Sequence, residues 1–133
     1  MAGVAAWVAA GFRTWVRMQR MSGVAVIAVS GQLGVAAVQP LRAALQAAGP
    51  RPVILDLGDV SAVDESAAVL GGMCRYARAR GSEVILVRIT PLEVTLREAG
   101  VLDLYETAAD VTDALELIAH EQQTADLDMW IQG

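Results

Sequence analysis

Residues 52–80 read PVILDLGDVSAVDESAAVLGGMCRYARAR, and the class of the fold follows from this stretch. It opens on Pro52–Leu57, a short apolar run with β-branched residues, which predicts a buried strand. It closes on Ser66–Arg80, where apolar residues recur at helical spacing before Gly81, which predicts an amphipathic helix with a glycine stop. A buried strand that leads into an amphipathic helix is the repeating unit of α/β domains.

The same alternation of strands and helices extends on both sides of this stretch. Upstream, Val24–Val29 predicts a buried strand, and Val38–Ala48 predicts a helix that ends at Gly49-Pro50. The elements predicted downstream are a strand over Glu83–Ile89, a helix from the capping box Thr90-Pro91-Leu92-Glu93 to Gly100, a short strand at Leu104–Glu106, and a helix over Asp110–Gln122 capped by Asp110. We therefore predict an α/β fold in which about four strands form a parallel or mixed sheet covered by about four helices.

The chain divides into an N-terminal extension (1–21), a domain (22–123) and a C-terminal tail (124–133) that either docks or hangs free. In the extension, Val4, Val8, Phe12 and Trp15 fall at helical spacing, which predicts an amphipathic helix. Two interpretations of this helix stay open: Trp7 and Trp15 dip into a membrane interface, or the helix packs on the domain or on a second copy. A natural start at Met18 or Met21 is a third alternative.

The extension does not have the pattern of a secretory signal. Its arginines follow the apolar run instead of leading it, and the run is far shorter than the roughly 20 residues that span a bilayer. We expect a cytoplasmic protein whose only possible membrane contact lies in residues 1–20.

Composition and charge exclude several classes of function. The 133 residues suit one domain, and with one cysteine, Cys74, and one histidine, His120, they favour neither disulfides nor a Cys/His metal site. The absence of lysine excludes Walker-type phosphate loops and Schiff-base chemistry. Residues 1–55 carry five arginines and no acid, whereas the remainder carries all 15 acids, and the net charge of −5 argues against nucleic-acid binding. No cofactor or metal is expected.

The candidate site is Asp59–Ala68, DVSAVDESAA, because strand-to-helix turns are where α/β sheets place their sites. Ser66 falls at or next to the helix N-cap, where its hydroxyl can accept a hydrogen bond from an N–H of the first turn. Two interpretations stay open: Ser66 is a cap, or it is phosphorylated, since a helix N-terminus stabilises a phosphate. A phosphate would add charge to a docking surface that already holds Asp64 and Glu65.

The other polar residues do not form an enzyme site. The acids of this turn, Asp59 included, have no partner acid at a hydrolase spacing, and no G-x-S-x-G motif surrounds Ser66. We therefore predict that the protein is not an enzyme. Arg75, Arg78 and Arg80 lie on the same helix as Ser66, where they form either a solvated face or a docking strip for an acidic partner.

The order of the elements and several motifs resemble the STAS domain, the fold of bacterial anti-sigma factor antagonists and of the cytoplasmic ends of sulfate-type transporters. Gly31-Gln32-Leu33 stands where that family has a Gly-Glu-Leu-Asp-like turn. Asp59–Ala67 resembles the family's Asp-x-Ser-x-x-Asp-Ser-Ser-Gly segment. Thr90-Pro91 and residues 98–105 resemble its Ser-Pro and Thr-Gly-Leu-x-x-x-Phe segments.

This resemblance implies a regulator of sigma factors. An anti-sigma serine kinase would bind the unphosphorylated protein at a surface that includes Gln32, Asp59 and the Ser66 turn. Phosphorylation of Ser66 would break the complex. The protein would be a monomer or a weak homodimer. A STAS subunit of a membrane transport complex, such as a partner of a lipid-transport ATPase, is the alternative.

The sequence also departs from the family pattern. Gln32 and Gly34 replace acidic residues of the first turn, Glu65 replaces a small residue before the serine, and Ala67 replaces a glycine after it. The chain is therefore either a divergent regulator or a domain that binds its partner without being phosphorylated.

Overall fold

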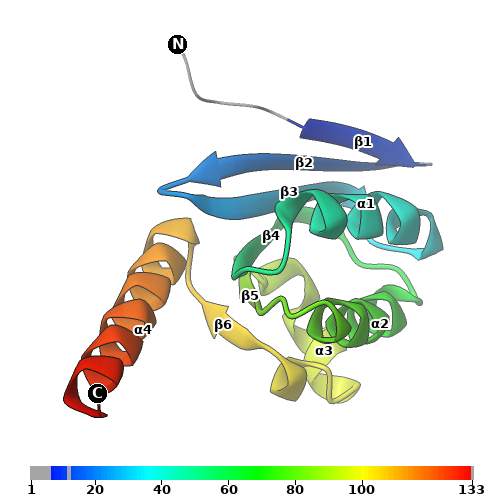
Figure 1. Ribbon diagram of the computed structural model, residues 1–133. Helices are drawn as coiled ribbons and strands as arrows, with labels where there is room; N and C mark the ends of the chain where they lie inside the picture. Colours follow the sequence, from blue (N-terminus) through cyan, green and yellow to red (C-terminus); the bar gives the residue numbers. More distant parts are fainter. Residues whose placement is uncertain (1–6, 12, 133) are drawn as a thin grey trace.

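A computed structural model describes residues 7–11 and 13–132. They form one six-stranded mixed sheet in the order β1-β2-β3-β4-β5-β6 with helices on both faces (Figure 1). The strands are β1 (Trp7–Gly11), β2 (Thr14–Met21), β3 (Val24–Gln32), β4 (Val53–Ser61), β5 (Val84–Val87) and β6 (Glu106–Ala108). The helices are α1 (Val38–Ala48), α2 (Ser66–Ala79), α3 (Glu93–Glu98) and α4 (Val111–Gln132), joined by the short 3-10 helices η1 (Val35–Ala37), η2 (Thr90–Leu92) and η3 (Leu102–Leu104).

The predicted α/β class and mixed sheet are confirmed. The four strands predicted from the sequence correspond to β3–β6, which run parallel, while β1, β2 and β3 pair antiparallel. The last of them is displaced, because Leu104 ends η3 and the predicted strand Leu104–Glu106 shares only Glu106 with β6. Residues 90–98, predicted as one capped helix, instead form the turn η2 followed by α3, and no side-chain cap is found there among the described residues.

The N-terminal helix predicted over residues 1–20 is wrong where the structure describes this segment, because residues 7–11 and 14–21 are strands. In β2, Thr14, Val16 and Met18 are buried, whereas Trp15 and Arg17 are exposed. This period of two fits a strand, and β3 provides the neighbour with which β2 pairs along its whole length. The predicted helix residues Val4 and Phe12 lie outside the described residues.

A tight turn joins β2 to β3. Ser22 and Gly23 have φ of 52° and 80°, and a two-residue loop with two positive φ angles matches the right-handed twist of a hairpin. The predicted boundary between extension and domain falls at this turn. The sheet is continuous across it, and Val16 and Met18 belong to the main core.

The main core lies between the sheet and the layer of α1, α2 and α3 (Figure 1). Its largest fully buried side chains are aliphatic and come from strands, helices and connections alike: Ile27, Leu33, Leu41, Leu45, Leu55, Leu57, Leu70, Leu86, Leu92 and Leu96. Because Leu33 belongs to a connection, burial anchors the start of the β3–α1 loop to the core.

The opposite face of the sheet is covered by the first turns of α4. Ala114 and Ile118 pack there on Val26, Ile54 and Ile85. As predicted, Asp110 caps this helix, since its carboxylate accepts the Asp113 N–H at 2.9 Å.

The tail predicted to begin at residue 124 continues α4 through Gln132, so the helix is about ten residues longer than expected. Figure 1 shows this end leaving the body of the domain. Leu127, Trp130 and Ile131 are exposed there, so the last turns of α4 add little to the core.

Candidate functional site

The candidate site lies where the parallel strands β3 and β4 end side by side. Gln32 is paired with Ser61, and the Leu33 N–H donates to the Ser61 carbonyl at 3.1 Å. The loop that follows β3 and the loop that leads into α2 therefore start at the same edge of the sheet, as strand-to-helix turns of α/β domains do. Gln32 and the Ser66 turn, far apart in sequence, are brought together.

Ser66 is the first residue of α2, and its side chain is fully buried. Its Oγ donates to the Leu33 carbonyl at 2.7 Å and accepts the Val63 N–H at 2.9 Å. The predicted bond to a first-turn N–H is not formed, because the hydroxyl faces back into the preceding loop. The N-cap position belongs to Glu65, for which no capping bond of the side chain is found among the described residues.

A second buried hydroxyl supports the same loop from the other side. Thr14 Oγ1 donates to the Gln32 carbonyl at 2.6 Å, and the Gln32 N–H donates to the Arg13 carbonyl at 2.8 Å. Gly31 has a φ of +86°, and a Cβ atom there would collide with the Arg13 carbonyl oxygen. Sequence reasoning missed Thr14, although the alternation of residues 14–18 could have placed it on the buried face of a strand.

A shallow hollow of about 170 Å³ lies beside the Ser66 turn, next to the end of β3, the β3–α1 connection and the β4–α2 loop. The hollow is lined by Thr14, Gln32, Gly34, Val35, Ala36, Val63 and Glu65. Val35 is 66% exposed, Glu65 is exposed, and Asp64, its neighbour in the chain, is exposed as well. A Cβ atom on Gly34 would lie 3.1 Å from Glu65 Oε1, so the Glu65 carboxylate lies over the start of the β3–α1 connection.

Asp59, another predicted partner-binding residue, faces a different direction. Its neighbour Val60 points into the main core, so the Asp59 side chain lies on the opposite face of the sheet. Arg88 pairs with it at 3.6 Å and with Asp56 at 2.9 Å, and the hydrogen bond and charge of Asp56 raise the pKa of Arg88. Asp59 is therefore part of an ion-pair group on β4 and does not line the hollow.

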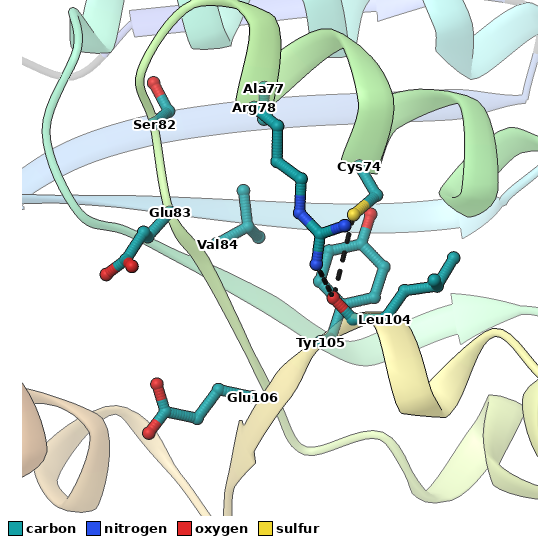
Figure 2. Close-up of a pocket in the computed structure, with 9 residues that line it drawn as sticks. All are labelled: Cys74, Ala77, Arg78, Ser82, Glu83, Val84, Leu104, Tyr105 and Glu106. Carbon is teal, nitrogen blue, oxygen red and sulfur yellow. Dashed lines mark hydrogen bonds between the residues drawn. The ribbon is translucent and has the colours of Figure 1, made fainter.

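Arg75 and Arg78 lie in the second half of α2, and Arg78 is about 18 Å from Ser66 along the axis at 1.5 Å per residue. Arg75 is exposed, whereas Arg78 is anchored at a separate cavity of about 220 Å³ (Figure 2). There the Arg78 guanidinium donates to the Leu104 carbonyl at 2.9 Å, with Cys74 Sγ 3.7 Å from the same oxygen. The arginines and the Ser66 turn thus form two separate surfaces.

Several side chains that line the cavity in Figure 2 make contacts that stabilise the fold. The Tyr105 hydroxyl donates to the Leu70 carbonyl at 2.6 Å, and burial raises the pKa of this phenol above its ordinary value. On the side away from Cys74, burial and the nearby carboxylates of Glu121 and Glu83 raise the pKa of Glu106. Cys74 is buried and lies on the wall of the cavity.

Two further properties concern only the part of the chain that the structure describes. No group of three or more His, Cys, Asp and Glu side chains there is arranged to hold a metal ion. None of the helices in the described ranges is long and apolar enough to cross a bilayer.

The fold and the site together define a small α/β domain with a mixed sheet, helices on both faces and a loop surface ordered by two buried hydroxyl groups. A model of the STAS domain matches residues 16–114. The chain belongs to the STAS domain family, which confirms the resemblance seen in the sequence. No curated protein sequence matches the chain significantly.

Several solved structures share this fold. An anti-sigma factor antagonist from Mycobacterium paratuberculosis is 17% identical with a TM-score of 0.64, and the match covers 80% of this chain and 94% of that one. A serine-to-glutamate variant of RsbS from Moorella thermoacetica is 24% identical with a TM-score of 0.67 over 81% and 97% of the two chains. The anti-sigma factor antagonist SpoIIAA in its unphosphorylated form is 20% identical with a TM-score of 0.57 over 87% and 97%.

Proposed function

We propose that this protein is an anti-sigma factor antagonist-like regulator that acts by binding an anti-sigma factor of the serine kinase type in the cytoplasm. The observation that carries the proposal is the loop surface at the ends of β3 and β4, which is exposed and yet held by buried hydrogen bonds from Thr14 and Ser66. Similar solved structures include anti-sigma factor antagonists, which supports this role. The protein would work by contact alone, without a cofactor or a reaction of its own.

The surface suits protein binding because its backbone is already ordered. The carbonyls of Gln32 and Leu33 are both fixed by side-chain hydroxyls, so a partner that docks here does not have to order the loop. Ordering loops is one of the main costs of association. Val35 offers an exposed apolar contact, while Asp64 and Glu65 offer charge that can select a partner.

The switch at Ser66 predicted from the sequence is not required by this proposal. Its hydroxyl is buried, so a kinase would reach it only after the first turn of α2 separated from the loop that holds Leu33. That opening would break both hydrogen bonds of the hydroxyl.

The alternative, a subunit of a membrane transport complex, was suggested by a predicted amphipathic helix with Trp7 and Trp15 at the membrane. Trp7 lies in β1 and Trp15 in β2, so this observation no longer supports the alternative. The docking strip for an acidic partner that includes Arg75 and Arg78 stays a separate prediction, because these arginines lie away from the proposed surface.

Binding measurements with purified anti-sigma factor kinases from the same genome test the proposal. We expect one of them to bind the full chain, and Asp64→Lys or Glu65→Lys to weaken that binding at least about tenfold, since each reverses an exposed charge of the turn before α2. Glu98→Lys is the matched control, because Glu98 is an exposed acid at the end of α3. Equal weakening by all three changes, or by none, would refute the proposed surface.

A further inference from the structure

Two neighbouring residues at the start of α2 have opposite environments. Ser66 is fully buried, whereas Glu65 is exposed at the N-cap position. We propose that Ser66 is a structural residue that holds the Leu33 loop, and that it is not a phosphoacceptor. Glu65 gives the partner surface a permanent negative charge, so phosphorylation does not switch this protein. The statement about the partner rests on the proposed function, whereas the statement about Ser66 stands by itself.

The geometry of Ser66 opposes phosphoryl transfer. A kinase must bring the hydroxyl oxygen in line with the γ-phosphorus of ATP and place a base on the hydroxyl proton. Here the proton is donated to the Leu33 carbonyl, and the oxygen accepts the Val63 N–H. Neither the oxygen nor the proton faces solvent, since the side chain has no exposed surface.

A phosphate on Ser66 would also have no stable place. It would bring about −1.5 to −2 charge and three acceptor oxygens into a position that faces the Leu33 carbonyl, another acceptor. Leu33 itself is fully buried, so the loop cannot yield without exposing core surface. The group that fits at this position is a small hydroxyl.

Glu65 occupies the position at which a charge is both exposed and favourable. Negative groups are stabilised at a helix N-terminus, because the N–H groups of the first turn point outward there. The Glu65 carboxylate lies over Gly34, and both residues line the hollow of the proposed partner surface. A glutamate carries its charge without a kinase, so a partner that binds here must present a cationic group to it, because an unpaired carboxylate buried in an interface weakens binding.

The accessibility of the two positions can be compared directly with thiol probes. Ser66→Cys and Glu65→Cys are each made in a Cys74→Ala background, and the rate of reaction with iodoacetamide, a neutral reagent, is measured on the folded proteins. We expect the Glu65→Cys protein to react as a free thiol does, and the Ser66→Cys protein to react at least about 100-fold more slowly. Rates within about fivefold of each other would overturn the assignment of Ser66 as a buried structural residue.

The full chain purified from its own cells provides the second readout. Intact-mass spectrometry with fragmentation is expected to find no phosphate on Ser66 under several growth conditions, and a phosphate mapped to Ser66 would overturn the proposal.

The charge of Glu65 is tested in the complex. Glu65→Gln should weaken partner binding about tenfold at low salt and less at high salt, whereas unchanged or tighter binding would refute the role assigned to this carboxylate. If no anti-sigma factor kinase binds the wild-type chain at all, the proposed function fails, while the thiol and mass results still decide the assignment of Ser66.

Discussion

Replacement of Ser66 by alanine tests the central feature of the site. The change removes one oxygen atom and with it two hydrogen bonds, to the Leu33 carbonyl at 2.7 Å and from the Val63 N–H at 2.9 Å. An unpaired buried polar group costs about 1–3 kcal/mol, and a partly buried bond contributes about 1 kcal/mol. Leu33 is buried and Val63 is half-buried, so we expect a loss of about 2–3 kcal/mol in the free energy of unfolding.

Urea unfolding followed by far-ultraviolet circular dichroism measures this loss. The slope of the free energy of unfolding against urea concentration should stay unchanged, because the surface exposed on unfolding is the same. In thermal unfolding, Tm should fall by about 10 °C. Ser61→Ala is the matched control, since Ser61 is an exposed serine five residues earlier whose hydroxyl makes no hydrogen bond found in the described part of the chain. We expect the control to stay within about 0.5 kcal/mol of wild type. If Ser66→Ala does the same, the hydroxyl does not hold the loop and the reasoning fails.

Three further changes test the fold around the site. Gly31→Ala should cost about 2–4 kcal/mol in urea unfolding, because the new Cβ meets the Arg13 carbonyl at positive φ. Gly23→Ala, also at positive φ but with open space around it, should cost about 1 kcal/mol. Burial raises the pKa of Tyr105 above its unfolded value of 10.0, so ionisation favours unfolding; wild-type stability should be constant below about pH 10 and fall above it, and Tyr105→Phe should abolish that fall. Trp130→Ala should change the free energy of unfolding by less than about 0.5 kcal/mol, because this side chain on the last turns of α4 is 84% exposed; a loss above 2 kcal/mol would show that the end of α4 is packed.

Hydrophobic periodicity, together with the glycine and proline residues that end helices and strands, was sufficient to predict most of the α/β architecture. The helix predicted over Val38–Ala48 has those bounds in the structure, since Gly49 with its positive φ ends it. The β4–α2 unit lies where residues 52–80 predict it, with a strand that ends four residues later than expected. These elements depend on local pattern, which the sequence records directly.

The N-terminal hairpin could not be assigned in this way, because the same residues satisfy two periods. Val8, Phe12 and Trp15 fit a helical stripe, while Thr14, Val16 and Met18 fit one face of a strand. The choice depends on the presence of β3, whose free edge pairs with β2 along its whole length. Tertiary context therefore overrides the local pattern.

For the site, the residue pattern was enough to locate a strand-to-helix turn with serine and acids at Asp59–Ala68, and it indicated the family. The role of each residue in that turn follows from the packing of distant segments. Ser66 is buried because the Leu33 carbonyl, 33 positions earlier, meets its hydroxyl, and Gln32 is held by Thr14 from a strand that the sequence had predicted as helix. The exposure of a side chain and the partner of its hydroxyl depend on which distant segments the fold packs against it, and no local pattern contains that information.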